Sequence, residues 1–220
     1  MNIIECKRLS NLPKQEWMKI KALHVPTEQA KTYNFEDRLH NLIDVKKVFD
    51  EKKIPLWLDG GTLLGAYRDN NWIPYDNDID LAILEEDWKS QVKELRKVFI
   101  NLGFIVRPSI YPKFSRLTLF REKEQIGLFG WSLDPSYEGG EYRVRPTNRI
   151  PIKFFENKEY IEFKGMSFCV LNPVEEYLVW RYGEKWQIPL DYHETTEWTS
   201  GNMCRDRKHW KKIMGSYTKK

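Results

Sequence analysis

Long apolar stretches and secretion signals are absent from the sequence. No window approaches the roughly 18 uninterrupted apolar residues that a membrane span requires. The opening segment, MNIIECKRLSNLPKQEW, lacks the apolar core of a secretory signal. These absences predict a protein that has no transmembrane segment and works in the cytoplasm.

Cysteine and histidine are scarce. The three cysteines, Cys6, Cys169 and Cys204, are odd in number and widely spaced, which argues against a disulfide framework or a paired-cysteine metal site. His193, Cys204 and His209 match no standard zinc spacing, so we interpret them as surface residues. Neither a Gly-x-Ser-x-Gly nor a Cys/His signature is found, so nucleophilic catalysis is not expected.

Positive charge is concentrated at one end of the chain. The net charge is +4, and residues 205–220 contain seven Lys or Arg against one Asp. Such a tail can contact an anionic partner, but a solvated terminus is the commoner case. Aromatic side chains on which bases could stack are nearly absent there, so nucleic-acid binding is not expected.

The remaining composition is that of a soluble globular domain, with 220 residues of which 41% are hydrophobic and 31% charged. Apolar residues recur at helical spacing over 35–49, with Phe35 in the series, behind Asn34, a favourable N-cap. A second helix is predicted over 86–102, ending at Gly103.

A third helix and several strands follow from local patterns. The helix, NPVEEYLVWRYG, is predicted with Asn172 as N-cap, Pro173 at its first position and Gly183 just past its end. Short apolar or alternating runs predict strands, and two of them, RLTLF and QIGLFGW, are interpreted as a hairpin across REKE. These runs are IPLWL, IDLAIL, FIVRP, RLTLF, QIGLFGW and the hairpin YIEFKGMSFCV.

Three segments are expected along the chain. Residues 1–33 show little periodicity and are interpreted as a segment that wraps the domain, residues 34–190 as the folded domain, and residues 191–220 as a polar, basic tail. Within the domain, residues 134–150 are expected to form a long loop over one face. The mixture of helices and strands predicts an α/β or α+β fold with a small mixed sheet flanked by helices.

Three aspartates occur at alternate positions in WIPYDNDIDLAIL. On an extended chain Asp76, Asp78 and Asp80 share one face, and their negative charges repel one another unless a cation neutralises them. Hard oxygen ligands of this kind favour Mg²⁺ or Mn²⁺. A calcium loop of the EF-hand type is not expected, because its required sixth-position glycine is replaced by Leu81.

A paired-glycine turn precedes the aspartates in DGGTLLGAYR. Gly60 and Gly61 allow the backbone to approach a ligand closely, and Thr62 can hydrogen-bond a phosphate oxygen at the start of a helical turn. Arg68 adds a guanidinium that can form two hydrogen bonds with a phosphate group. Phosphate at the turn and metal at the aspartates are the apparatus of phosphoryl-type transfer.

The stretch LDGGTLLGAYRDNNWIPYDNDIDLAI resembles the signature of the LicD/fukutin family, which has the nucleotidyltransferase fold. The resemblance extends to KFSRLTLFRE, IGLFGW and NPVEEYLVWRYGEKW, and covers roughly residues 36 to 189. It implies a nucleotidyltransferase-like fold over 34–190 and a metal-dependent transferase. Such an enzyme moves phosphocholine, ribitol phosphate or glycerol phosphate from a CDP-linked donor to a glycan hydroxyl, in lipopolysaccharide, teichoic acid, capsule or glycoprotein.

The resemblance also implies roles for individual residues. Asp78 and Asp80 correspond to the metal-binding catalytic pair, Asp76 supports them from the flank, and the paired glycines with Thr62 form the phosphate turn. Arg68 corresponds to a donor-phosphate contact. Arg116 falls where the family tends to carry a basic residue.

One position departs from the family pattern. A third carboxylate is usual in an Ile-Asp-Ile-Phe-like run, where this chain has Gly127. There are three explanations. The alignment of this run with the family pattern is shifted, or an acid such as Asp134 or Glu162 takes the place of the third carboxylate, or the protein transfers slowly or not at all. The third carboxylate commonly deprotonates the attacking hydroxyl. Two alternatives therefore stay open: an accessory protein that binds nucleotide or glycan, and a nucleotidyltransferase that uses an NTP on a small molecule.

Overall fold

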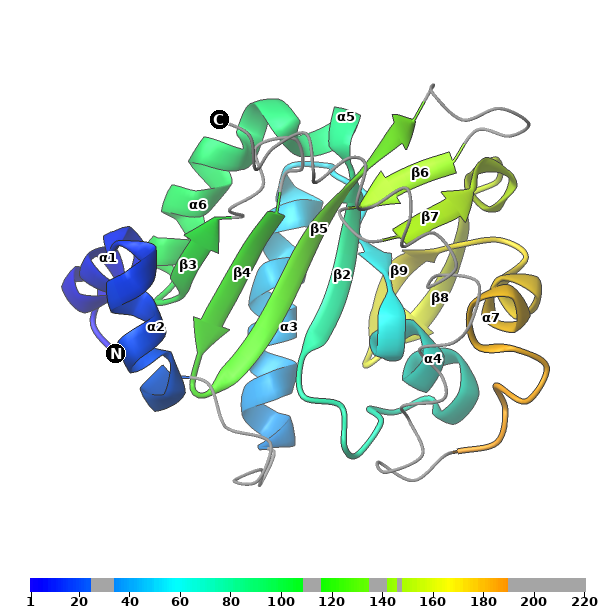
Figure 1. Cartoon of the computed structure of the whole chain (residues 1–220), viewed down its shortest axis with the longest axis horizontal. Coiled ribbons are helices and arrows are strands. Elements are labelled where there is room, and N and C mark those ends of the chain that lie inside the picture. The colour runs from blue at the N-terminus through cyan, green and yellow to red at the C-terminus, as the bar shows by residue number, and fades with distance from the viewer. Residues whose placement is uncertain (25–33, 109–115, 135–141, 146–147, 190–220) are drawn as a thin grey trace. The chain divides into compact units, whose positions relative to one another are not determined.

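The computed structural model describes residues 1–24, 34–108, 116–134, 142–145 and 148–189 (Figure 1). The chain forms two compact units. The first comprises Met1–Gly130 with Ile161–Cys169, and the second Trp131–Tyr160 with Val170–Lys220. The predicted tail over 191–220, with Cys204, lies outside the described residues.

The first unit is built on a seven-stranded mixed sheet in the order β3-β4-β5-β2-β1-β9-β8. Strand β1 is antiparallel to β2 and parallel to β9. This confirms the predicted α/β fold with a small mixed sheet. The strands are β1 (Trp57–Leu58), β2 (Ile79–Leu84), β3 (Ile105–Pro108), β4 (Arg116–Arg121), β5 (Glu124–Asp134), β8 (Glu159–Phe163) and β9 (Met166–Val170).

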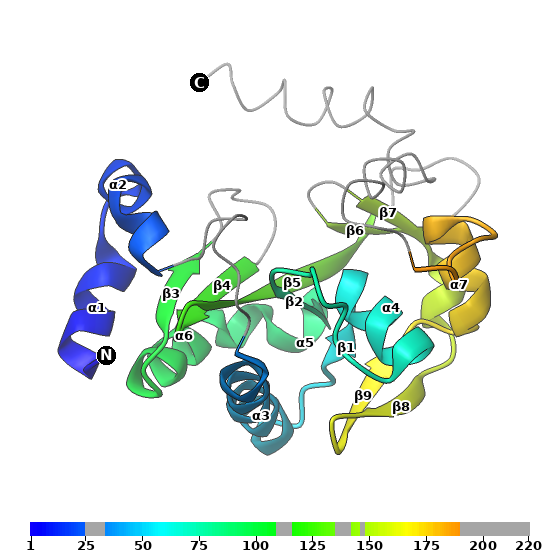
Figure 2. The ribbon, with the colours of Figure 1, turned by 90° about the horizontal axis from the view of Figure 1, so that it is seen from below.

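Helices α3 (Phe35–Glu51) and α6 (Val92–Asn101) cover one face of this sheet (Figures 1 and 2). The predicted cap is confirmed, since Asn34 accepts hydrogen bonds from the first-turn amides of α3. Phe49 and Phe99 are fully buried and pack with ring centroids 6.1 Å apart. Phe35, expected to face inward, is exposed, because it lies in the first turn.

Shorter helices complete the first unit: α4 (Gly60–Asp69) follows β1, and α5 (Glu85–Trp88) with η2 (Lys89–Gln91) leads from β2 into α6. Both predicted hairpins are confirmed. Strands β4 and β5 pair in antiparallel register with Arg121 opposite Glu124, and positive φ angles at the two intervening residues suit a type I′ turn. Strands β8 and β9 are joined by Lys164 and Gly165, which also have positive φ.

The N-terminal segment contains regular structure that its weak periodicity did not predict. Two helices, α1 (Ile3–Asn11) and α2 (Lys14–His24), lie against the edge of the sheet at β3 (Figure 2). Leu9 and Trp17 form one buried cluster with Ile105 and Phe120. A helix of this length is stabilised mainly by such tertiary contacts, which a weak local pattern does not reveal.

The second unit contains the hairpin β6 (Tyr142–Arg145) and β7 (Asn148–Pro151), with β6 paired to the end of β5, then η3 (Ile152–Phe155) and helix α7 (Val174–Tyr182). The expected loop over 134–150 therefore contains two strands. Asn172 is not the helix cap, because Pro173 is extended and occupies that position. Gly183 ends α7 with a φ of 89°, as predicted.

Within the part of the chain that the structure describes, each helix is too short or too polar to span a bilayer.

Candidate active site

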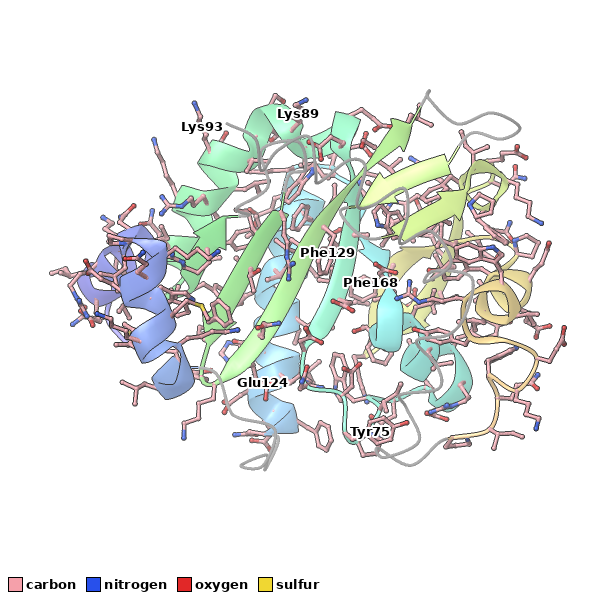
Figure 3. The ribbon with its side chains drawn as sticks, in the orientation of Figure 1. Tyr75, Lys89, Lys93, Glu124, Phe129 and Phe168 are labelled. Carbon is pink, nitrogen blue, oxygen red and sulfur yellow. The ribbon has the colours of Figure 1, made fainter. Side chains whose placement is uncertain are left out.

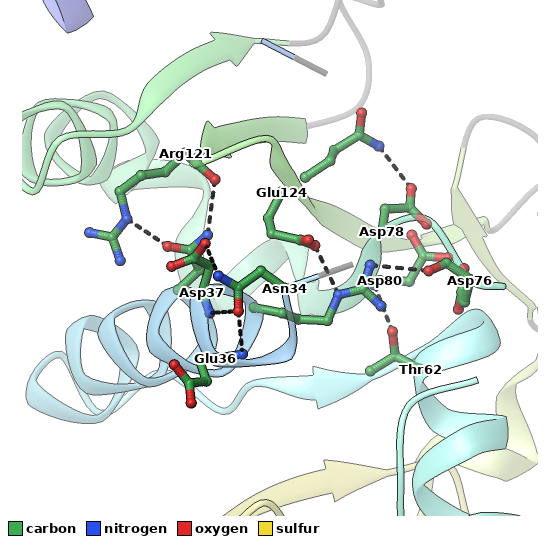
Figure 4. Close-up of polar contacts among 12 residues, drawn as sticks. Asn34, Glu36, Asp37, Thr62, Asp76, Asp78, Asp80, Arg121 and Glu124 are labelled. Atoms are coloured by element: carbon green, nitrogen blue, oxygen red, sulfur yellow. Dashed lines mark hydrogen bonds and ion pairs between the residues drawn. The ribbon is translucent and has the colours of Figure 1, made fainter. Parts of the chain in front are cut away.

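The paired-glycine turn and the acidic strand are joined directly. Asp59 caps α4 by accepting a hydrogen bond from the amide of Gly60 at 2.7 Å, and its own amide donates to the carbonyl of Asp80 at 3.1 Å. The hydroxyl of Thr62 accepts from the amide of Asp80 at 2.9 Å (Figure 4). The start of α4 is thus fixed to the first residues of β2, as the sequence analysis expected of a combined site.

The two glycines make room for carboxylates. A Cβ atom on Gly60 would lie 2.4 Å from Oδ2 of Asp80, and one on Gly61 would lie 2.2 Å from Oδ2 of Asp76. Both distances are far shorter than any real contact, so side chains at either position would displace the acids. Gly60 also has a φ of +57°, which favours glycine. The glycines were predicted to admit a ligand, and in the structure they admit Asp76 and Asp80.

Asp80 is approached by glycine from a second direction. Gly127 lies on β5, next to β2 in the sheet, and a Cβ atom there would lie 3.3 Å from Oδ1 of Asp80. A side chain at position 127 would therefore face Asp80. The same Cβ would lie 2.6 Å from the ring of Phe129, so that ring fills the space that a side chain at Gly127 would need.

The acids named as substitutes for a third carboxylate have different positions. Glu162 is exposed on β8, which is separated from β2 by β1 and β9 in the strand order. The side chain of Asp134 lies outside the described part of the structure. Of the two acids, the described residues therefore place Glu162 away from β2, and they place Gly127 beside Asp80.

Asp78 has a partner that the sequence analysis missed. The side-chain amide of Gln125 donates to Oδ2 of Asp78 at 2.8 Å. Gln125 and Gly127 are two apart on β5 and so share the face that points toward the acids. This spacing was a signal that could have identified Gln125.

Arg38 is a second residue missed from the sequence. It is fully buried on α3, and its Nε donates to Glu124 at 2.9 Å while Nη2 donates to the carbonyl of Asp76 at 3.1 Å (Figure 4). Its guanidinium also lies over the ring of Trp72, 5.4 Å from the centroid. Arg38 thereby holds the loop that leads into β2. Its place one residue before the helical series of Leu39 and Leu42 gave no sign of this role.

The acidic side chains resist ionisation. Burial, followed by the negative charge of Asp80, raises the pKa of Asp76 to about 6, against the opposing effect of Arg38 and of backbone amides. Burial and the charge of Asp76 raise the pKa of Asp78 to about 6, while Gln125, Arg38 and Arg116 act in the opposite direction. Carboxylates that repel one another in a half-buried position are suited to bind a cation.

The donor set fits a hard divalent cation that also binds substrate. Among the described residues, no group of three or more acidic, imidazole or thiol side chains forms a complete metal site. Mg²⁺ is usually held by one or two carboxylates together with substrate phosphates, and not by an all-protein cage. Asp78 and Asp80 supply two such carboxylates at the start of β2.

The two predicted arginines differ in their surroundings. Arg116 begins β4, its Cζ lies 4.4 Å from the ring centroid of Phe129, and its charge acts on Asp78, so the structure brings it to the site. Figure 3 shows Phe129 part-way along β5, with Glu124 at its start. Arg68 instead forms a two-point ion pair with its neighbour Asp69, at 2.9 and 2.7 Å. It lies about 12 Å along α4 from the glycine turn.

Comparison with known proteins identifies the family. The sequence profile described as LicD/FKTN/FKRP, nucleotidyltransferase domain, matches residues 53–173. The chain belongs to this family. The match includes the glycine turn, the three aspartates, Gly127 and Arg116, and it confirms the resemblance and the nucleotidyltransferase-like fold that were inferred from the sequence.

Curated relatives are transferases by name. The chain is 29% identical to human ribitol-5-phosphate transferase FKTN over 160 residues, which are 69% of this chain and 33% of that protein. It is 27% identical to the mouse FKTN protein over 173 residues, covering 76% and 36%. With mouse ribitol 5-phosphate transferase FKRP it shares 31% over 93 residues, covering 40% and 18%. The chain spans about a third of the length of the FKTN relatives.

Among solved structures, the chain is similar to the lincosamide antibiotic adenylyltransferase LnuA with bound lincomycin. The TM-score is 0.44 at 15% sequence identity, covering 72% of this chain and 92% of that one. The family assignment rests on the sequence profile.

Proposed function

We propose that this protein transfers a phospho-alcohol from a CDP-linked donor to a hydroxyl of a glycan, with Mg²⁺ or Mn²⁺ as cofactor. The observation that carries the proposal is the gathering of Asp76, Asp78 and Asp80 against the glycine turn at the start of α4. A helix N-terminus next to paired carboxylates suits a metal-bound diphosphate. Because the curated FKTN and FKRP relatives are named ribitol-phosphate transferases, ribitol phosphate is the first group to test.

Each residue of the site has a different role in this proposal. Asp78 and Asp80 would hold the cation, which neutralises charge on the transferring phosphate when bound. The amides of Gly61 and Thr62 belong to the first turn of α4, where N–H groups have no acceptor within the helix and can bind a phosphate oxygen. Arg116 provides a fixed positive charge for the donor, since its guanidinium is stacked on Phe129.

A thermal-shift panel tests donor binding. CDP-ribitol, CDP-glycerol, CDP-choline and nucleoside triphosphates would each be added with and without Mg²⁺. A ligand that prefers the folded state raises the unfolding midpoint. We expect the largest rise with a CDP-alcohol plus Mg²⁺, and little rise in the Asp78→Asn variant. Equal midpoints for all compounds in the wild type would contradict the proposal.

Gly127 favours a second candidate, an accessory protein that binds the donor but turns it over slowly. The absence of a side chain at Gly127 removes a proton acceptor from β5 and leaves metal and phosphate binding in place. Calorimetry with CDP-ribitol and Mg²⁺ beside a turnover assay separates the candidates, because binding without product favours the accessory role. Release of labelled pyrophosphate from an NTP would instead indicate nucleotidyl transfer.

A further inference from the structure

The first two residues of β5 are both linked to the segment that carries the aspartates, Glu124 through Arg38 and Gln125 directly. Successive side chains on a strand point to opposite faces. Glu124 is buried and binds Arg38, which rises from α3 on the helix-covered face and donates to the carbonyl of Asp76. Gln125 points the other way and donates to the carboxylate of Asp78. The loop that carries the aspartates is therefore held from both faces of the sheet (Figure 4).

The contact with Gln125 constrains how Asp78 can bind a cation. Its Nε2 lies 2.8 Å from Oδ2 of Asp78, so that oxygen is fixed by a donor and Oδ1 is left for other ligands. A primary amide supplies the donor without adding charge. A carboxylate at the same place would accept hydrogen bonds only, and would add a further negative charge beside the acids.

The neighbours of Gln125 on β5 make its contribution distinctive. Between residues 125 and 129, all of them described, three positions share the face toward the aspartates: Gln125, Gly127 and Phe129. Gly127 has no side chain to offer and Phe129 is apolar. Over this segment, Gln125 is the polar group that β5 brings to the acids.

We propose that Gln125 is a positioning residue that holds Asp78 in the orientation needed to share a divalent cation with Asp80. This inference rests on the proposed function. Partners that orient a metal ligand typically change metal affinity or activity by 10- to 100-fold when they are removed. Gln125 would thus act through Asp78, without touching the donor.

The test measures binding of Mn²⁺ alone, by the loss of its free electron paramagnetic resonance signal at pH 7.5. Gln125→Met keeps the length of the side chain and removes the amide, and Gln125→Leu does so with a different shape. Gln15→Met is the matched control, because Gln15 is exposed on α2 and far along the chain from the site. Unfolding midpoints in EDTA show whether each variant is folded.

We expect the Mn²⁺ dissociation constant to rise about tenfold or more in both Gln125 variants and to stay unchanged in Gln15→Met. Saturating Mg²⁺ should restore donor binding to the Gln125 variants, which retain both aspartates, but not to Asp78→Asn. If the wild type binds Mn²⁺ and folded Gln125 variants bind it equally well, the positioning role is wrong and the proposed function stands. If the wild type binds no Mn²⁺, with or without CDP-ribitol, both are wrong.

Discussion

The hydroxyl of Thr62 accepts a hydrogen bond from the backbone amide of Asp80 at 2.9 Å. Thr62 is buried in the first turn of α4, and Asp80 is the second residue of β2. Together with the bond from the amide of Asp59 to the carbonyl of Asp80, this hydrogen bond ties the glycine turn to the start of β2. Thr62 was expected to contact phosphate through its hydroxyl, and the structure shows that the oxygen also has this internal partner.

Replacing Thr62 by valine should therefore loosen the site. The Thr62→Val variant keeps the shape of the side chain but leaves the partly buried amide of Asp80 without its acceptor, which costs about 1 to 3 kcal/mol of unfolding free energy. Thr62→Ser keeps the acceptor and should lose much less. Urea denaturation of the three proteins measures the difference. A valine variant as stable as the wild type would show that the bond contributes nothing.

The raised pKa values predict how stability depends on pH in the metal-free protein. The pKa of Asp78 rises from 3.8 in the reference state to about 6 in the fold. The folded state therefore binds a proton more tightly than the unfolded state. The stabilisation that comes from proton binding at Asp78 is fully present below about pH 4 and is lost as pH rises through 6.

Asp78→Asn should remove this dependence. At about 1.4 kcal/mol per pKa unit the shift corresponds to at most about 3 kcal/mol, and since Asp78 is half-buried we expect about 1 to 2 kcal/mol. In EDTA, the variant should match the wild type near pH 4 and be more stable by that amount at pH 7.5. Urea titrations at the two pH values measure this difference. A variant that is less stable at both pH values would contradict the raised pKa of Asp78 that burial and the charge of Asp76 produce.

Alanine substitutions at three glycines distinguish the effect of backbone strain from the effect of steric conflict with the aspartates. Gly165 has a φ of +74° and open space around it, Gly61 conflicts only with Asp76, and Gly60 combines a positive φ with conflict at Asp80. Gly165→Ala should cost about 1 to 2 kcal/mol of stability and leave Mn²⁺ affinity unchanged. Gly61→Ala should weaken Mn²⁺ binding, and Gly60→Ala should impair both properties. Unaltered Mn²⁺ binding in Gly60→Ala and Gly61→Ala would contradict the close approach.

The buried pair of Arg38 and Glu124 should show strong coupling. Arg38→Met leaves a buried carboxylate without its cation, which costs about 3 to 5 kcal/mol. Glu124→Met leaves the buried guanidinium of Arg38 without this carboxylate, whereas the double variant removes both charges. We expect the double variant to be clearly more stable than the sum of the single losses predicts, as a double-mutant cycle in urea would measure. Additive losses would show that the two side chains act independently.

Local patterns predicted the glycine turn and the acidic strand because both are short-range signals. The two features lie within about twenty residues of each other, from Gly60 and Gly61 to Asp80. The residue types there predict a strand followed by the start of a helix. The hairpin turn at Glu122 and Lys123 was likewise bracketed by two apolar runs. The mixed sheet followed from the order of these elements.

The supporting contacts could not be predicted in the same way. Gln125 is 47 residues from Asp78, and Arg38 is 86 residues from Glu124. These contacts depend on the order of the strands in the sheet and on the helix that packs against the sheet. A single sequence specifies neither. The cap of α7 was missed for a different reason: Pro173 adopts an extended conformation and so moved the start of the helix by one residue.

The N-terminal helices have a consequence for the handling of this protein. The hydroxyl of Ser10 accepts a hydrogen bond from the amide of Val106, at 2.8 Å, on the first strand of the sheet order. Helix α1 thus occupies a strand edge that could otherwise pair with a second molecule. A shortened protein beginning at Asn34 would carry the complete acidic centre, yet it would present that bare edge and tend to aggregate on purification.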